Sequence, residues 1–537
     1  MRQIIGALIF CCAFLKLTAQ EAVQDLSKKA IKGFITETEH RDGNYLVTYK
    51  MGGDKKKKEV FYETYLFDQH LKFVKNEEVA EPKLSAADKP DKTQTRFSAY
   101  VGGCSSFDAL SMKLRLSATT INTTWDYKKQ RYVYDKTLKS ENIKPKNDNG
   151  KYVGYAAFNG GDDGKLFVIA TTTSKEAKNK NDFYILSINS DLNILEKQID
   201  ISGSQSLVFT SQLDNGDVVM LFAPKKSEPD LFNYTYLLYN SSGELKNKVN
   251  FKSPSTNMLV TNVQEANGAI FFCGTSTKTN DPFDEVFDDY VAEISNPCYK
   301  EAQNYRDEKW MKKADNKMDF FHLLKFSGSQ LHFATVTPIS EFKSKFKTAP
   351  ADKKADPYKG KNFQLNAFYV TAAEEYLVAG QLMSKVNLGM GNPVKSYEDI
   401  ICFYFDKQGQ LKTQFGTEKM NTEKKSEIFA VKQSFIPSKD GKSVYWTILE
   451  AKGFKGYDSF NDAYIEEKPT YRPKYFPRIS KLDLQDNSIA NFKVLGNEKY
   501  FVSRAYAPIV DATEHSITFI GNDDDYKKLW LAKYVYE

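Results

Sequence analysis

A spaced repeat runs through the middle of this sequence and limits the folds open to it. The dipeptides Asp163-Gly164, Asn215-Gly216 and Asn267-Gly268 follow one another at intervals of 52 residues. A mainly apolar run follows each of them, as expected for a strand that is buried on both faces. Self-similarity at a fixed period of this length is typical of an array of one supersecondary unit.

One period, residues 203–254, can be divided into four strands. Residues 207–213 and 218–222 flank the Asn-Gly turn, whose residues tolerate positive φ. Residues 234–239 and 245–251 follow after loops that contain proline, serine and glycine. Four antiparallel strands in each repeat of roughly 50 residues are typical of a β-propeller blade.

The same pattern recurs less regularly elsewhere in the chain. The sequence therefore predicts an all-β protein, a β-propeller of seven or eight four-stranded blades. The last unit is short of strands, and residues 22–38 could complete it, so that both ends of the chain close the ring. The predicted units are residues 30–78, 96–146, 151–202, 203–254, 255–305, 317–418, 425–495 and 500–537.

Two other organisations stay open at this stage. One is a pair of stacked sandwich domains. The other is a smaller propeller with a separate β-domain over residues 20–95, for which the charged, proline-containing residues 77–95 would be the boundary.

The N-terminus has the features of an export signal. Arg2 precedes an apolar stretch over residues 4–15, and Ala19 is a small residue before Gln20. This predicts a signal peptide over residues 1–19, because the stretch is too short for a membrane-spanning helix. We therefore expect an exported protein in the periplasm, where an interaction partner could associate it with the outer membrane; the alternative is an extracellular location.

The cysteines that follow this signal predict packing rather than metal binding. Cys273 and Cys298 are close enough in sequence for a disulfide, whereas Cys273 and Cys402 lie in apolar runs and are interpreted as buried thiols. No zinc-type spacing occurs. Asp523-Asp524-Asp525 lacks the spacing of a calcium loop. We expect no metal and no cofactor.

Sequence motifs for catalysis are absent. The chain has no Gly-x-Ser-x-Gly, no His-Glu-x-x-His, no P-loop and no Gly-x-Gly-x-x-Gly. Only 5 histidines occur, none at ligand spacing, and His332 is interpreted as a packed strand residue. This predicts a protein that is not an enzyme, although carboxylates from distant blades could still meet at the axis of a propeller.

Three insertions interrupt the repeat, at residues 299–362, 384–397 and 453–478. Loops inserted into a repeat scaffold often carry its function. The third is rich in aromatic residues, which are frequent at the centres of protein interfaces. The candidate partner-binding residues are Trp310, Phe454, Tyr457, Phe460, Tyr464, Tyr471, Tyr475 and Phe476.

One short segment resembles a known family. Ser438-Lys439-Asp440-Gly441-Lys442 is similar to the "SPDGK" repeat of TolB-like periplasmic propellers, with a lysine inserted. That resemblance implies a propeller hairpin and no particular site. In style and setting the chain also loosely resembles soluble periplasmic proteins of type IX secretion, including the plug of the translocon.

These observations predict a non-enzymatic module for protein–protein interaction. Its partner would be an outer-membrane or secretion-system component in the periplasm. The alternative is a propeller that binds carbohydrate or another small ligand, or a glycan-active enzyme with axial carboxylates. The net charge of +6 is too small for a dedicated nucleic-acid-binding protein of 537 residues.

Overall fold

The computed structural model describes most of the chain after the N-terminal segment. The described residues are 19–537 without 55–58, 85–88, 102–113, 127–130, 160–165, 173–181, 190, 288–317, 353–354, 362, 387–393, 421–430, 453–473 and 503–507. Residues 1–18 are outside this set, so export stays a prediction of the sequence.

The described strands form eight antiparallel sheets, which we call blades 1–8 in chain order. Blade 1 consists of β2 (Phe34–Arg41), β3 (Asn44–Asp54), β4 (Glu59–Phe67) and β5 (Phe73–Pro82). Blade 2 consists of β6 (Lys92–Val101), β7 (Leu114–Asp126) and β8 (Arg131–Ile143). Blade 3 consists of β9 (Lys146–Asn147), β10 (Gly150–Asn159), β11 (Leu166–Thr172), β12 (Phe183–Ile188) and β13 (Ile194–Gln198). Blade 4 consists of β14 (Gln205–Gln212), β15 (Val218–Pro224), β16 (Asn233–Tyr239) and β17 (Leu245–Lys252).

The second half of the chain forms the other four blades. Blade 5 consists of β18 (Leu259–Ala266), β19 (Ala269–Ser276), β20 (Phe320–Ser327) and β21 (Gln330–Pro338). Blade 6 consists of β23 (Phe363–Val370), β24 (Tyr376–Val386), β25 (Val394–Phe405), β26 (Leu411–Thr417) and the parallel strand β22 (Phe346–Thr348). Blade 7 consists of β27 (Lys432–Pro437), β28 (Ser443–Lys452), β29 (Lys474–Asp483), β30 (Ser488–Ile489) and β31 (Lys493–Val494). Blade 8 consists of β32 (Tyr500–Phe501), β33 (Ile509–Asp511), β34 (Ser516–Asp523), β35 (Lys528–Val535) and the N-terminal β1 (Gln20–Asp25).

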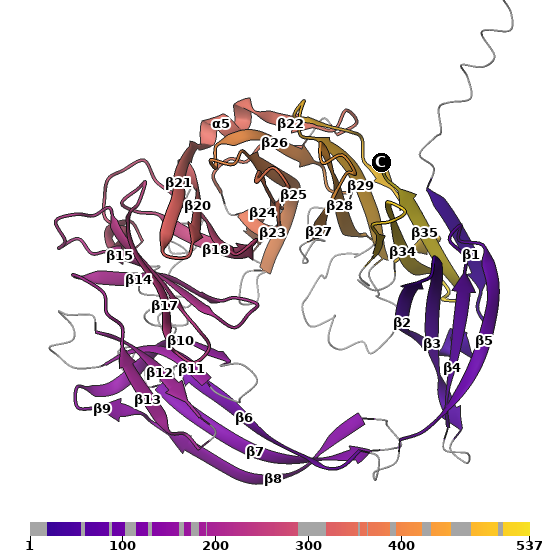
Figure 1. Ribbon diagram of the computed structural model, residues 1–537, viewed down its shortest axis with the longest axis horizontal. Helices are drawn as coiled ribbons and strands as arrows, with labels where there is room; N and C mark the ends of the chain where they lie inside the picture. The colour runs from indigo at the N-terminus through magenta and orange to yellow at the C-terminus, as the bar shows by residue number, and fades with distance from the viewer. Residues whose placement is uncertain are drawn as a thin grey trace, which may run out of the picture.

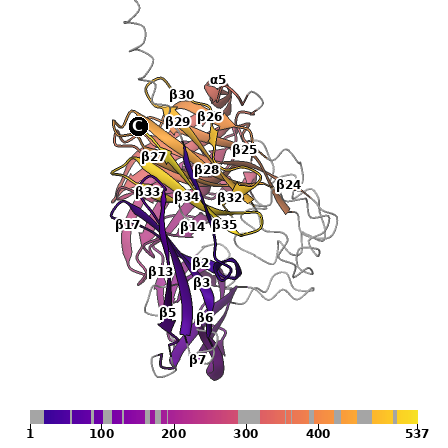
Figure 2. The same ribbon diagram turned by 90° about the vertical axis from the view of Figure 1, so that its right-hand side faces the viewer.

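The blades are arranged around a central opening, as a propeller requires (Figure 1). An inner strand of one blade contacts the inner strand of the next at several joints: β6 contacts β10, β14 contacts β18, β18 contacts β23, and β23 contacts β27. Figure 2 shows the ring from its edge, with blade 1 toward the viewer. The short helices η1 (Ala30–Lys32), α1 (Phe283–Val286) and α5 (Ile339–Ser344) lie in connections between strands.

Strand β1 joins the two ends of the chain. It pairs antiparallel with β35, from Gln20 opposite Lys533 to Asp25 opposite Lys528. The neighbouring core also crosses this joint, since Ile520 and Leu531 of blade 8 pack with Tyr45 of blade 1. Residues of the segment 20–95 therefore share a core with the last blade and do not form a separate domain.

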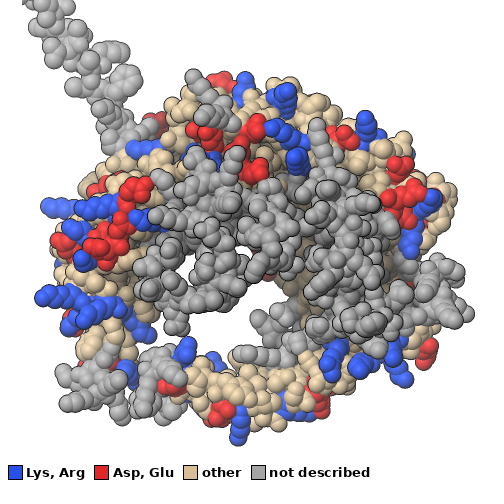
Figure 3. Space-filling model, turned by 180° about the vertical axis from the view of Figure 1, so that it is seen from behind, with Lys and Arg blue, Asp and Glu red and all other residues tan. Residues whose placement is uncertain are grey.

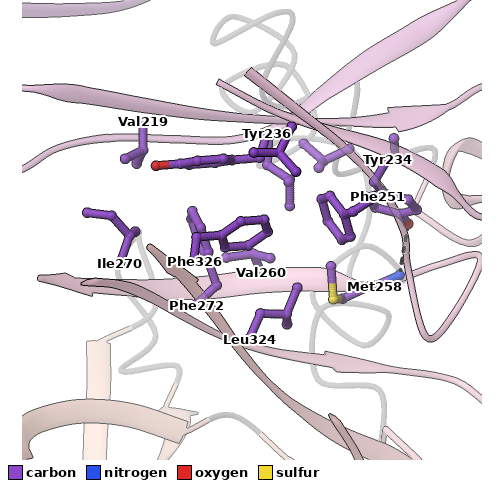
Figure 4. Packing of buried hydrophobic residues seen from close by; sticks show 14 of the residues in the cluster. Val219, Tyr234, Tyr236, Phe251, Met258, Val260, Ile270, Phe272, Leu324 and Phe326 are labelled. Atoms are coloured by element: carbon purple, nitrogen blue, oxygen red, sulfur yellow. Dashed lines mark hydrogen bonds between the residues drawn. The ribbon is translucent and has the colours of Figure 1, made fainter. Parts of the chain in front are cut away.

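Apolar clusters lie between consecutive blades because each sheet is hydrophobic on both faces. Tyr236 of blade 4 stacks on Phe326 of blade 5, with ring centroids 4.5 Å apart (Figure 4). In the same cluster the backbone N–H of Met258 donates to the hydroxyl of Tyr234 over 3.1 Å. Such clusters join blades 2 to 3, 3 to 4, 4 to 5, 5 to 6, 6 to 7, 7 to 8 and 8 to 1.

The joint between blades 1 and 2 differs. Among the described residues, none of the apolar clusters connects these two sheets. The outermost strand of blade 1, β5, is exposed along nearly its whole length. The connection there follows the charged segment that the sequence suggested as a boundary.

The repeat units need one correction. We expected β20 and β21 in a unit covering residues 317–418, but both strands pair within blade 5, after β18 and β19. The supposed insertion at residues 299–362 therefore contains two blade strands together with α5 and β22. The other two insertions also end in paired strands: β24 and β25 extend into residues 384–397, and β29 starts at Lys474.

Two of the three spaced dipeptides can be compared with the turns of the structure, since Asp163-Gly164 lies outside the described residues. Asp42 and Gly43 have φ of 51° and 76°, and Asn267 and Gly268 have φ of 50° and 71°. Positive φ at both central residues is the type I′ turn, whose twist matches that of the strands it joins. At Asn215-Gly216 only the glycine has positive φ, so the same dipeptide serves a different turn there.

Two surface properties bear on the predicted setting. Lys and Arg are interspersed with Asp and Glu around the rim of the molecule (Figure 3). The helices in the described part of the chain are all too short or too polar to cross a membrane.

The thiols of Cys273 and Cys402 are free and buried, as expected, and burial raises the pKa of Cys273 to about 12. Cys298 lies outside the described residues.

Candidate ligand-binding site

The candidate partner-binding residues are for the most part not described. Trp310, Phe454, Tyr457, Phe460, Tyr464 and Tyr471 lie outside the described residues. Tyr475 is half-buried in the core between blades 7 and 8, and its backbone bridges to Val502. Phe476 is only 3% exposed and lies against the ring of Phe501, with centroids 6.5 Å apart. Phe476 is therefore a core residue and offers no surface to a partner.

A different feature marks the inner strands. In five blades the first hairpin carries a β-bulge, with one extra residue on the strand nearest the central opening. A bulge bends its strand and turns a side chain to a new direction, and bulges are frequent beside active sites. The register shifts lie at Ile35/Glu37, Gly154/Ala156, Leu207/Phe209, Val260/Asn262 and Leu365/Ala367.

Glycines face the bulges of blades 5 and 6. Gly274 is paired with Val260, and Gly380 with Leu365. A Cβ atom on Gly274 would lie 2.7 Å from the carbonyl oxygen of Leu259, and one on Gly380 would lie 2.1 Å from that of Gln364. The bulged strands can approach their partners this closely only because these positions lack a side chain.

The two bulges meet at a pocket of about 280 Å³ between blades 5 and 6. Its lining comes from β18, β19 and β20, from β23 and β24, and from the segment that leads into β23. The lining residues are Leu259, Thr261, Asn262, Thr275, Met318, Phe321, Tyr358, Gly360, Lys361, Phe363, Gln364 and Met383.

Aromatic rings give the pocket a rigid floor. Phe321 and Tyr358 are 2% and 1% exposed. The ring of Tyr358 lies edge-on between those of Phe321 and Phe363, at centroid distances of 6.3 and 6.1 Å. Burial raises the pKa of Tyr358 well above its ordinary value, so its phenol stays neutral and can act as a hydrogen-bond donor.

Polar groups line the rim. Thr261, the extra residue of the bulge, donates to the carbonyl of Cys273 over 3.3 Å, and its hydroxyl accepts from the Asn262 amide over 3.0 Å. The amide of Gln364 donates to the carbonyl of Leu365 over 3.4 Å. The carbonyl oxygens of both amides have no hydrogen-bond partner within the described part of the chain. Lys361 is exposed and is the single charged lining residue.

The wall beside Lys361 depends on another glycine. Gly360 has φ of 76° and accepts a hydrogen bond from the backbone N–H of Met318 over 2.7 Å. A Cβ atom there would lie 2.2 Å from the carbonyl oxygen of Met318. This contact fixes the segment before β23 against blade 5 and so holds the two sides of the pocket together.

The buried charged groups lie elsewhere and connect blades. The Arg478 guanidinium donates to the Glu450 carboxylate and to the carbonyl of Glu418, both over 2.8 Å, and to the hydroxyl of Thr417 over 2.7 Å. Arg478 and Glu450 are 4% and 0% exposed. Both residues belong to blade 7, and the hydrogen bonds of Arg478 to Thr417 and Glu418 link that blade to blade 6 in the interior.

No family model and no curated protein matches the chain. Among solved structures, a puromycin hydrolase is 8% identical with a TM-score of 0.26, over 92% of this chain and 60% of that one. The α-L-arabinofuranosidase of Fusarium graminearum is 11% identical with a TM-score of 0.24, over 70% and 90%. The β-propeller domain of the Trilobed protease from Pyrococcus furiosus is 8% identical with a TM-score of 0.22, over 87% and 98%.

These structures correct the functional expectation from the sequence. We expected a non-enzymatic module for protein–protein interaction, but the three solved chains named above come from hydrolytic enzymes. At such identities and TM-scores the likeness extends to the propeller fold alone. This chain also spans only 60% of the puromycin hydrolase. The chemistry of the site is therefore argued from its own residues.

Proposed function

We propose that this protein is a small-ligand-binding propeller and that the pocket between blades 5 and 6 binds one ring-sized unit of a carbohydrate. The observation that carries the proposal is the pairing of two bulged inner strands around a pocket with an aromatic floor and an amide rim. Small-molecule sites typically occupy about 300–1,000 Å³. The pocket, at about 280 Å³, is just below that range, which restricts its ligand to a single sugar ring.

The lining matches the two kinds of surface on a sugar. A pyranose ring has apolar C–H faces, which pack on aromatic side chains, and hydroxyl groups around its edge. Phe363 and Phe321 offer the apolar contact, while Asn262, Gln364 and Lys361 offer donors and acceptors at the rim. Met318 and Met383 add adaptable apolar surface.

The described lining contains no carboxylate and no imidazole. The pair of axial acids required for glycoside hydrolysis is therefore not found in this pocket. What the lining supports is recognition of the ligand, and the proposal is restricted to that step.

The test is binding of a panel of neutral monosaccharides and disaccharides, measured by calorimetry and by saturation-transfer NMR. We expect one or more members to bind, and Asn262→Ala and Gln364→Ala each to weaken that binding about 5- to 30-fold, the loss of one or two hydrogen bonds. Both side chains lie at the rim, so the thermal midpoint should stay within about 2 °C of the wild type.

The matched control is Gln330→Ala, an exposed glutamine on β21 of the same blade that does not line the pocket. It should leave both affinity and stability unchanged. The proposal is wrong if no sugar of the panel binds, or if the rim variants bind as tightly as the control.

A further inference from the structure

Blade 2 carries a second hollow, remote from the pocket between blades 5 and 6. It measures about 220 Å³ and is lined by Lys92 and Gln94 of β6, Ile121 and Thr123 of β7, and Tyr132 and Tyr134 of β8. Leu114, Leu116 and Ala118 of β7 pack on blade 3. Because side chains alternate along a strand, Ile121 and Thr123 point to the opposite face.

This opposite face is the one turned toward blade 1. Among the described residues, no apolar cluster packs blade 1 against it. Instead the connection from blade 1 holds two aromatic residues in place. The indole N–H of Trp125 donates to the carbonyl of Leu84 over 3.0 Å, and the hydroxyl of Tyr132 donates to that of Pro90 over 3.1 Å.

The aromatic rings are thus fixed before any ligand arrives. Trp125 and Tyr132 lie edge to face with centroids 5.1 Å apart. Tyr134 is 61% exposed, and its hydroxyl is held by Thr137 at 2.6 Å. An exposed ring that is already held by a hydrogen bond presents apolar surface at a lower entropy cost on binding.

Two ammonium groups stand beside these rings. Lys92 lies 4.6 Å from the centre of the Tyr132 ring and Lys89 lies 6.0 Å from that of Trp125. Neither lysine forms an ion pair with a carboxylate among the described residues, and Gln94 forms no hydrogen bond there. Within the described part of the chain, the hollow therefore combines aromatic surface, an amide without a hydrogen bond and lysines without a carboxylate partner.

We propose that this face of blade 2, formed by Lys92, Gln94, Thr123, Tyr132 and Tyr134, is a second binding site and that it takes an acidic oligosaccharide. One sugar ring stacks on Tyr134, Gln94 hydrogen-bonds its hydroxyls, and a uronate carboxylate pairs with Lys92. The charge of Lys92 selects the acidic ligand, since no carboxylate is among the described residues that line the hollow. This site does not depend on the pocket between blades 5 and 6.

The experiment uses the full-length protein and two probes, a galacturonic acid trisaccharide and a galactose trisaccharide as its uncharged counterpart. Calorimetry at low salt should show that the acidic probe binds at least 10-fold more tightly. Its binding should weaken as salt is raised, because screening reduces the attraction to exposed ammonium groups.

Two variants test whether Tyr134 and Lys92 contact the acidic probe. We expect Tyr134→Ala to reduce affinity for the acidic probe at least 10-fold, and Lys92→Met to remove the preference for the acidic over the neutral probe. The controls are Leu138→Ala and Lys139→Met on β8, the strand of Tyr134, and both residues are exposed and outside the hollow. They should bind like the wild type.

Each contrary result overturns the proposal. It is wrong if the acidic probe does not bind, if the neutral probe binds equally well, or if Tyr134→Ala and Lys92→Met bind like their controls. Loss of binding in Gln364→Ala, with Tyr134→Ala unaffected, would place the acidic ligand in the pocket between blades 5 and 6 instead.

Discussion

At the residue scale, two histidines in blade 5 show that the position of a residue in its strand decides whether its side chain is buried or exposed. His332, which the sequence suggested as a packed residue, is exposed on β21. His322 on β20 is fully buried. Its Nδ1 lies 3.1 Å from the carbonyl of Thr335 and its Nε2 lies 2.7 Å from the hydroxyl of Ser276. Because a carbonyl only accepts, Nδ1 carries the proton and Nε2 accepts from Ser276.

This residue predicts a pH dependence of stability. Burial lowers the pKa of His322 from 6.5 to about 4. The unfolded chain takes up a proton near pH 6.5 while the folded chain does not, so the contribution is complete above pH 6.5 and is lost as pH falls toward 4. The loss is about 3 kcal/mol. Urea unfolding between pH 7 and 4 should show it in the wild type and not in His322→Gln.

The exposed histidine provides the control for that measurement. His332→Gln should keep the pH dependence of the wild type, because its side chain is exposed in the folded protein. Equal slopes of stability against pH for the wild type and His322→Gln would contradict the assignment.

At the element scale, the bulge and its facing glycine are the unit that shapes the ligand pocket. The sequence contains the signal, since apolar runs end at Gly274 and Gly380, but glycine at the end of a strand has several meanings. Only the register shows that each glycine lies opposite a bulge of the neighbouring inner strand.

We expect Gly380→Ala to distort the pocket. Its new Cβ would lie 2.1 Å from the carbonyl oxygen of Gln364 and 2.6 Å from a ring carbon of Phe363, so the inner strand must move. Overpacking of this kind costs about 1–3 kcal/mol, and binding of the sugar should be lost. Urea unfolding and calorimetry measure the two effects.

Gly441→Ala separates backbone strain from crowding. Gly441 has φ of 70° with no atom within 4 Å of a Cβ there, so this variant is destabilised by about 1–2 kcal/mol through its backbone alone. It should bind the sugar normally. Normal binding by Gly380→Ala as well would show that the bulge does not position the lining.

At the scale of the whole molecule, the pairing of β1 with β35 makes the last blade depend on the first residues of the described chain. Six residues pair across this joint. The indole N–H of Trp530 donates to the Glu21 carboxylate over 3.3 Å, and Lys528 and Asp25 form an ion pair at 3.1 Å. Without β1, the outer edge of β35 would offer unpaired backbone groups to other chains.

A variant that lacks residues 20–25 should unfold at a thermal midpoint a few degrees lower and aggregate at lower concentration. A synthetic peptide with the sequence of residues 19–27 should restore the midpoint by adding its strand to β35. Calorimetry and light scattering measure both effects. An unchanged midpoint without the peptide would mean that the pairing contributes little to stability.

Turn dipeptides at a fixed interval and the apolar runs between them are local properties of the chain, and they were enough to predict the all-β propeller. That prediction misplaced β20 and β21 because the segment between β19 and β20 is long, and it placed Phe476 on a surface although that ring is in the core. The positions of the two candidate binding sites follow from contacts between residues that are far apart in the chain. Thr261 and Gln364 are about a hundred residues apart and meet because neighbouring blades place their bulged inner strands together. Lys92 and Tyr132 meet because β6 and β8 flank β7. Such contacts depend on register and blade order, which no local pattern in the chain contains.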